Sequence, residues 1–283
     1  ILKITPQNFD ALHLLGVIAG QRDEHESAVD LISKAIAIKS NDARSHYNLG
    51  FSLQKLKKHE SALISYENAL LLDPNYGIAF SNRAAIFKEL HQLDSALTNY
   101  NQALLLNTLS AEDYSNRSVV LLDMRRTAEA IADCEQALRI MPSFPKAFYN
   151  LGLALIDLNQ FDKAVTAFDK ALNIQPEYEY LFGLRQHTQM KLCAWRDFGL
   201  NVTNITHGVH AEQKVSSPFP MLSLTDDLFT QHKSAKIWNI DKNPVMLTLG
   251  PLLKKARQPK IRLGYYSADF HNHATAYLMA ELF

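Results

Sequence analysis

PKAFYNLGLALIDLNQFDKAVTAFDKALNIQP, residues 145–176, sets the pattern that most of this 283-residue chain repeats. It predicts two helices, each with apolar residues on one side only. The face of the first helix consists of Phe148, Leu151, Gly152 and Leu155, and that of the second of Ala164, Phe168 and Ala171. Such helices bury their apolar sides by packing against each other and against neighbouring helices.

The same pattern recurs every 34 residues, five times in all. The small residue of the first helix falls at Gly16, Gly50, Ala84, Ser118 and Gly152. The second helix carries two alanines, at Ala28, Ala62, Ala96, Ala130 and Ala164 and at Ala35, Ala69, Ala103, Ala137 and Ala171. Between these alanines lie the larger residues Ile32, Tyr66, Tyr100, Cys134 and Phe168. Small side chains let two helix backbones approach closely, and the larger residues fill the remaining space.

A helix-turn-helix period of 34 residues resembles the tetratricopeptide repeat, over residues 9–178. The resemblance implies a mainly α fold in which the repeats stack into a right-handed superhelical solenoid with a concave groove. Pro74, Pro142 and Pro176 end the second helices, because proline cannot continue a helix. Residues 1–8 match the end of such a unit, so we expect the chain to begin inside a longer array.

Composition narrows the classes of partner. Lys and Arg together number 29, as do Asp and Glu, so no basic excess is available for a sequence-independent nucleic-acid binder. No apolar run is long enough to cross a membrane. Cys134 and Cys193 lie far apart and indicate reduced thiols rather than a disulfide framework. We therefore expect a cytoplasmic protein; the sequence indicates no oligomeric state.

Asparagines recur two residues before the small residue of the first helix, at Asn48, Asn82, Asn116 and Asn150; the first repeat has Leu14 there. This position is rotated by about 100° from its neighbour in the apolar stripe, so the side chain is expected to leave the core and face the groove. A carboxamide both donates and accepts, and can pair with the backbone of an extended peptide. Alternatively, each asparagine bridges to the backbone of the neighbouring repeat.

Other recurring positions carry weaker signals. His25 and His59 share a phase and are expected to be exposed turn residues. Tyr47 and Tyr149 also share a phase, and either line the groove or pack between repeats. His207 and His210 are spaced i,i+3, but no third ligand is near, so no metal site is predicted.

Beyond Pro176 the sequence period fails. Residues 179–198 predict one capping helix, with Tyr180, Leu184, Met190 and Trp195 covering the last repeat. Residues 199–259 predict a helical junction, including a helix after Thr225 that the Thr225 hydroxyl caps. The last residues, 260–283, predict a strand (260–267), a polar loop (269–273) and a helix (274–283). That order is typical of the first βα unit of an α/β domain.

Four segments resemble the junction between repeats and catalytic region in protein O-linked N-acetylglucosamine transferases, particularly bacterial ones. They are KLCAWRDF (191–198), SSPF (216–219), LTDD (224–227) and KIRLGYYSADFHNHATAYLMAELF (260–283). The resemblance implies metal-free, inverting transfer of a sugar from UDP-N-acetylglucosamine (UDP-GlcNAc) to Ser or Thr hydroxyls, on a GT-B-like fold of two Rossmann-like lobes. It places His273 in the active-site loop, and assigns Asn48, Asn82, Asn116 and Asn150 to holding the acceptor polypeptide.

The donor-binding lobe of that family has no counterpart in residues 1–283, so we expect these residues to bind no cofactor and to be inactive alone. UDP-GlcNAc is expected as the donor substrate of the parent enzyme, and Ser/Thr-containing polypeptides as its acceptors. A fucosyl donor fits the same residues. The competing hypothesis is a non-enzymatic repeat scaffold or adaptor that binds extended peptides, since such repeats often serve binding alone.

Overall fold

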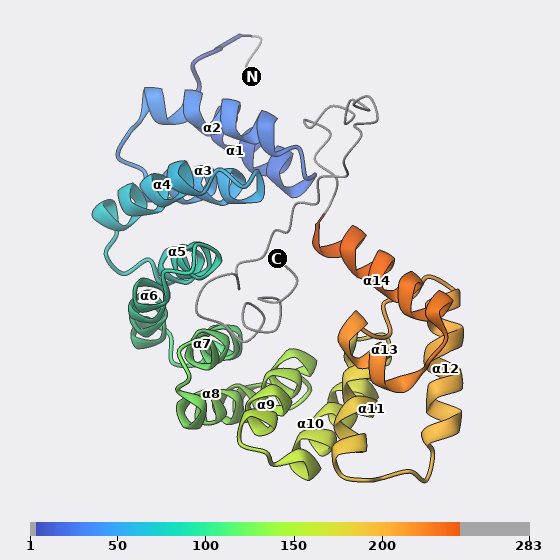
Figure 1. Cartoon of the computed structure of the whole chain (residues 1–283). Coiled ribbons are helices and arrows are strands. Elements are labelled where there is room, and N and C mark those ends of the chain that lie inside the picture. Colours follow the sequence, from blue (N-terminus) through green and yellow to red (C-terminus); the bar gives the residue numbers. More distant parts are fainter. Residues whose placement is uncertain (1–3, 244–283) are drawn as a thin grey trace, which may run out of the picture. The chain divides into compact units, whose positions relative to one another are not determined.

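The computed structural model describes residues 4–243, and the elements among them are fourteen α-helices (Figure 1). Ten helices make the repeats: α1 (Phe9–Gln21), α2 (His25–Ile38), α3 (Ala43–Lys55), α4 (His59–Leu72), α5 (Gly77–Glu89), α6 (Leu93–Leu106), α7 (Ala111–Asp123), α8 (Thr127–Ile140), α9 (Pro145–Asp157) and α10 (Phe161–Ile174). Four follow: α11 (Leu181–Lys191), α12 (Phe198–His210), α13 (Pro218–Leu224) and α14 (Leu228–Lys242). The predicted mainly α solenoid is confirmed for the described residues.

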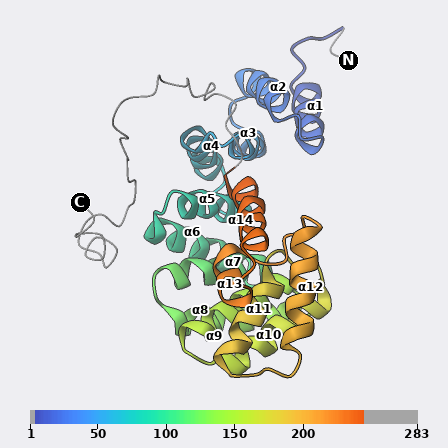
Figure 2. The same ribbon diagram turned by 45° about the vertical axis from the view of Figure 1, so that its right-hand side comes forward.

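The ten repeat helices stack as a solenoid (Figures 1 and 2). Each odd-numbered helix packs on the even-numbered helix that follows it, and each even-numbered helix packs on the next odd one. The odd-numbered helices also contact one another in order, from α1 to α9. They therefore form one continuous surface, which we call the A-helix face.

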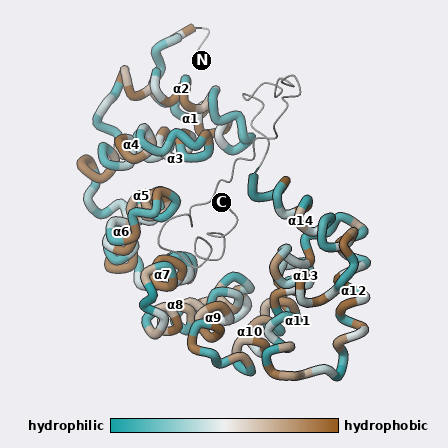
Figure 3. The backbone as a smooth tube through the Cα atoms, in the orientation of Figure 1, coloured by the Kyte–Doolittle hydropathy of each residue, from teal (hydrophilic) through white to brown (hydrophobic). Residues whose placement is uncertain are grey.

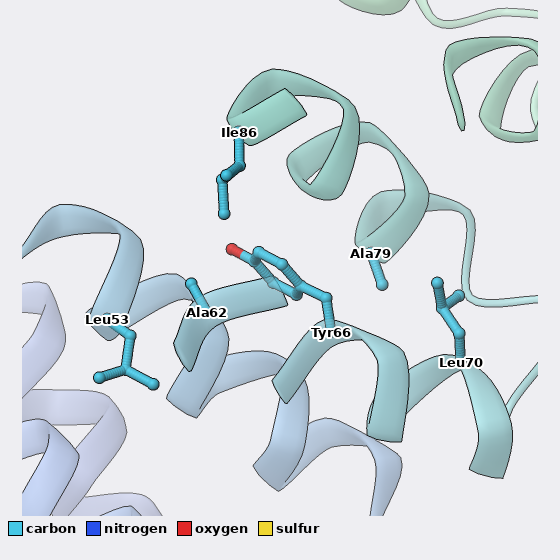
Figure 4. Packing of buried hydrophobic residues seen from close by; sticks show 6 residues of the cluster. All are labelled: Leu53, Ala62, Tyr66, Leu70, Ala79 and Ile86. Atoms are coloured by element: carbon cyan, nitrogen blue, oxygen red, sulfur yellow. The ribbon is translucent and has the colours of Figure 1, made fainter. Parts of the chain in front are cut away.

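The core lies where the sequence period predicts it. All ten alanines of the second helices are at most 1% exposed, and so are the five larger residues between them. Figure 4 shows Tyr66 of α4 pointing toward Ile86 of α5, with Ala62 and Ala79 nearby. The Tyr66 hydroxyl donates to Oε1 of Gln54 at 2.8 Å, so this buried ring keeps its polar group satisfied.

Each repeat turns between its two helices through one left-handed residue. These residues are spaced by 34 and have φ of 56–61°: Asp23, Lys57, His91, Arg125 and Asn159. The amide after each one bonds back to the last turn of the helix, as in Gln92 N to the Phe87 carbonyl at 2.8 Å. This is the Schellman arrangement, which satisfies carbonyls that the helix end would leave unpaired.

Hydropathy alternates along the repeat helices, as expected of helices with one buried side (Figure 3). Within residues 4–243, no helix is both long and apolar enough to span a membrane. The turn over residues 5–8 leads into α1, whose N-cap is Asn8; the Asn8 side chain accepts from Ala11 N at 2.9 Å.

The structural period continues one helix further than the sequence period. Helix α11 packs on α10 as α3 packs on α2, and Cys193, two residues after its end, is a left-handed residue 34 positions after Asn159. Helix α11 therefore takes the position of the first helix in a sixth repeat. Residues 179–198 are not one long helix, because the Cys193 turn separates α11 from α12. Leu184 packs against the last repeat as predicted, whereas Trp195 is 53% exposed and covers nothing there.

A large polar residue stands where the other repeats have glycine, alanine or serine. This is Gln186, which is 1% exposed and accepts a hydrogen bond from Asn201 of α12 at 2.7 Å. Its size explains why α12 packs far less closely on α11 than α2 packs on α1. The array of close helix pairs therefore ends here, and α12 to α14 gather around a separate core of Ile205, Val209, Met221 and Leu224.

Helix α14 forms where a helix was predicted, but Asp227 caps it. The Asp227 carboxylate accepts from Thr230 N at 3.0 Å and from the Thr230 hydroxyl, and Thr225 only bonds the Asp227 amide, at 3.1 Å. The assignment of Thr225 as the cap was therefore wrong; its hydroxyl is two residues too early to reach the free amides of the first turn. The predicted strand, loop and helix of residues 260–283, and with them His273, lie outside the described residues.

Candidate functional site

Three of the four asparagines predicted to bind peptide form a hydrogen bond with the residue 35 positions earlier. That residue lies on the first helix of the preceding repeat. Asn48 Nδ2 donates to His13 Nε2 at 2.9 Å, and Asn82 Nδ2 donates to the Tyr47 hydroxyl at 3.0 Å. Both asparagines are half-buried. Each amide is thus fixed by its nitrogen end to the neighbouring repeat.

For the third, Asn150, the prediction that the side chain leaves the core is wrong. It is 2% exposed, and its Nδ2 donates to the Ser115 carbonyl at 2.9 Å and to the Ser115 hydroxyl at 3.1 Å. The reason lies in the preceding repeat, where Ser115 and Ser118 are small and fully buried and leave room for the amide. Asn150 therefore bridges to the backbone of the neighbouring repeat.

In Asn116 the amide oxygen, and not the amide nitrogen, is bonded to the protein. Its Oδ1 accepts from the Lys146 ammonium at 2.6 Å, and Asn116 itself is half-buried. The Lys146 side chain is exposed, but surrounding protein desolvates its ammonium, and this, with the charge of Lys88, lowers the pKa of Lys146. Such a group, reached by water yet surrounded by protein, is expected on a recessed surface.

These contacts leave one end of three amides available. Oδ1 of Asn48 and of Asn82 accepts no hydrogen bond from residues 4–243, and Nδ2 of Asn116 donates none to them. A carbonyl oxygen can accept from a peptide N–H, and an amide nitrogen can donate to a peptide C=O. Because the other end is anchored, these groups are held in position before a ligand arrives.

Tyr47 and Tyr149 pack between repeats. The Tyr47 ring lies 5.1 Å from that of Tyr76, and the Tyr149 ring stacks on Tyr178 at 5.2 Å. Burial, and next the proximity of Tyr76, raises the pKa of Tyr47, even though Asn82 donates to its hydroxyl. Tyr47 therefore serves to orient Asn82.

The prediction that His25 and His59 are exposed turn residues is wrong. His25 is the first residue of α2 and is 8% exposed; its ring meets Phe51 edge-on at 6.4 Å. His59 occupies the same place in α4, and its side chain is 21% exposed. Both open the second helix of their repeat, where an aromatic ring can pack against the first helices.

A cavity of about 430 Å³ opens beside Asn48, between α1 and α3. Phe51, His25 and Lys55 line it, and the Lys55 ammonium lies 5.2 Å from the Phe51 ring centroid. Gly20 also lines it, and a Cβ placed there would make an ordinary contact with Ser52 Oγ at 3.7 Å. Sequence analysis missed Phe51 and Lys55; both lie on α3 at helical spacings from Asn48, which could have indicated a shared surface.

The described residues do not gather a metal site. No group of three or more His, Cys, Asp or Glu side chains among residues 4–243 could hold an ion. His210, for which no metal role was predicted, bonds the Thr230 hydroxyl through Nε2 at 2.9 Å.

Comparison with known proteins agrees with the geometry. Residues 43–76 and 145–178 match the tetratricopeptide repeat model. No curated protein matches the chain.

Solved structures with similar folds include PilF of Pseudomonas aeruginosa, 20% identical, covering 70% of this chain and 90% of that one, with a TM-score of 0.63. MamA from Desulfovibrio magneticus RS-1 is 18% identical, over 60% of this chain and 96% of that one, with a TM-score of 0.56. YrrB, described as a TPR protein with an unusual peptide-binding site, is 22% identical, over 62% of this chain and 91% of that one, with a TM-score of 0.53.

These findings define the class. The chain contains tetratricopeptide repeats, matched at residues 43–76 and 145–178, and its described part forms an all-helical solenoid. At these identities the likeness establishes the fold alone. The resemblance to sugar transferases rests above all on residues 260–283 and stays a prediction.

Proposed function

We propose that the A-helix face binds an extended segment of another polypeptide by its backbone. The observation that carries this is the anchoring of Asn48, Asn82 and Asn116, each bonded at one end to the protein and open at the other. Backbone recognition needs such groups at a regular spacing along a surface, whatever the side chains of the ligand are. The reported peptide-binding site of YrrB, a protein of the same fold, supports the proposal.

The test is calorimetric titration of the chain with a disordered, Ser/Thr-rich peptide. Changing Asn82 and Asn116 together to Ala is expected to weaken binding about tenfold or more, since each lost hydrogen bond contributes about 1 kcal/mol. The matched control changes Asn68 and Asn173, on α4 and α10, to Ala. Equal affinity of wild-type and Asn82/Asn116 proteins, both folded by circular dichroism, would exclude the proposed face.

We further propose that the bound polypeptide is the acceptor of a protein O-glycosyltransferase that uses UDP-GlcNAc. The resemblance of residues 260–283 to that family supports this, and His273 is its candidate active-site residue. The chemistry needs an acceptor hydroxyl held in place, removal of its proton and stabilisation of the departing diphosphate. The repeats supply the first requirement by holding the acceptor. Cys134 and Cys193 are free thiols, which supports a reducing compartment such as the cytoplasm.

Transfer of labelled N-acetylglucosamine from UDP-GlcNAc to the same peptide, by the natural gene product that carries this sequence, tests the enzymatic proposal. His273→Ala is expected to lower transfer strongly and to leave peptide affinity unchanged. Residues 1–283 alone are expected not to bind UDP-GlcNAc. Peptide binding with no transfer would favour the scaffold alternative.

A further inference from the structure

An aromatic cavity of about 480 Å³ lies where the last repeat meets α11, α13 and α14. We call it the α14 pocket; its lining includes Tyr149, Tyr178, Glu179, Tyr180, Trp238 and Lys242. Tyr149 directly precedes Asn150 on α9, so the pocket adjoins the A-helix face. The Tyr180 and Trp238 rings meet nearly edge to face, at 4.7 Å and 69°.

A cation of the protein itself occupies this aromatic corner. The Lys242 ammonium lies 5.2 Å from the ring centroids of both Tyr180 and Trp238. Aromatic faces attract cations at such distances. Lys242 is the last residue of α14 and its side chain is 45% exposed, so its ammonium can move into water when another cation takes over its contacts with the rings and with Asp241.

The charges around the pocket require one such cation. Without Lys242, the carboxylates of Glu179 and Asp241 face the single ammonium of Lys214, which lies 2.8 Å from Glu179 Oε1 and 2.5 Å from Asp241 Oδ1. The Tyr180 hydroxyl adds a hydrogen bond to Asp241 Oδ2 at 3.1 Å. Two carboxylates against one ammonium leave a net charge of −1, which Lys242 neutralises, 2.7 Å from Asp241.

We infer that the α14 pocket binds an arginine or lysine side chain of the polypeptide ligand, and that Lys242 holds the site in the free protein. That the ligand is a polypeptide rests on the proposed function; the affinity of the pocket for a cation does not. An incoming guanidinium would stack on Tyr180 or Trp238 and pair with Glu179 or Asp241 after Lys242 swings into solvent. The pocket would thus select ligands with a basic residue near one end of the bound segment.

The experiment uses N-acetylarginine methylamide as the probe and Trp238 fluorescence as the readout. The chain has two tryptophans, so Trp195→Phe leaves Trp238 as the single reporter. In that background, Lys242→Gln is expected to bind the probe about tenfold more tightly, because the probe no longer competes for two cation–π contacts. Glu179→Gln is expected to weaken binding.

Neutral N-acetylnorleucine methylamide, of similar length, is the matched control and is expected not to bind. Equal binding of both probes, unchanged affinity in Lys242→Gln, or no binding to either protein would overturn the inference. The probe is a single blocked amino acid, too short to span the A-helix face, so a failure of peptide binding with normal probe binding would count against the proposed function alone.

Discussion

At Gly152 the two helices of the fifth repeat approach as closely as their side chains permit. A Cβ at this position would lie 2.1 Å from the Phe168 ring, and one at Gly50 would lie 2.9 Å from Tyr66. A Cβ at Gly20, on the first helix of the first repeat, would have its nearest neighbour at 3.7 Å, which is an ordinary contact. Two glycines in the same kind of helix are therefore under opposite constraints.

We predict that Gly152→Ala lowers the free energy of unfolding by about 1–3 kcal/mol, the usual cost of overpacking a core. Gly20→Ala is expected to raise it by up to about 1 kcal/mol, since alanine favours the helix. Urea unfolding followed by circular dichroism measures both. A gain for Gly152→Ala would contradict the close packing described here.

The 34-residue period predicted the buried positions well, because burial of Ala62 or Tyr66 depends on neighbours that the repeat itself supplies. It did not predict the burial of Asn150, which depends on two serines of another repeat. Nor did it find the left-handed turns, because Asp, Lys, His, Arg and Asn occupy them and none of these marks such a turn as glycine would. Arg185, at the phase of Arg83 and Arg117, was the available sign that α11 continues the array.

At the scale of the element, each first helix of the five repeats is followed by a left-handed residue that is not glycine. His91 has φ of 56°, is exposed and keeps both Schellman bonds through backbone groups alone. A left-handed conformation costs an L-residue about 1–2 kcal/mol, and glycine avoids this at an entropic cost of about 0.5–1 kcal/mol.

His91→Gly is therefore expected to stabilise the protein by about 0.5–1 kcal/mol. His91→Ala, which removes the same side chain and keeps the strain, serves as the control and is expected to give no gain. Thermal unfolding compares the two. Equal stability of both variants would mean that the turn is unstrained.

Helix α14 depends on the charge of its cap. Hydrogen bonds from the hydroxyl and then the amide of Thr230 hold the pKa of Asp227 below its usual 3.8. A carboxyl group with a lowered pKa in the folded state stabilises that state above its unfolded pKa, and this is lost as the pH falls through the folded value. The cap of α14 should therefore weaken only below about pH 3.8.

We predict that Trp238 fluorescence, followed in Trp195→Phe, changes as the pH falls through this acid range. Asp227→Asn keeps a good cap without a titrating group, so the part of the change that comes from Asp227 is expected to disappear. An identical acid profile in both proteins would show that Asp227 does not couple α14 to pH.

At the scale of the whole array, the same helix face has different surroundings in different repeats. Ile86, on α5, is fully buried under α4, whereas its counterpart Ile18, on α1, is 43% exposed. Ile86→Ala is expected to cost about 2–5 kcal/mol by leaving a cavity. Ile18→Ala is expected to cost less than about 1 kcal/mol. Denaturant titration measures the free energy of unfolding of the two variants. Equal losses of this free energy would mean that Ile18 is covered in solution.

The central claim is that the A-helix face recognises the backbone of an extended polypeptide. The most direct measurement compares the affinity of the wild-type chain for one Ser/Thr-rich peptide and for the same peptide with alternate amides N-methylated. Methylation removes N–H donors and keeps every side chain. We expect about tenfold or greater weakening if Asn48 and Asn82 accept from those amides, and no further loss when the methylated peptide meets Asn82→Ala. Equal affinity for both peptides would contradict backbone recognition.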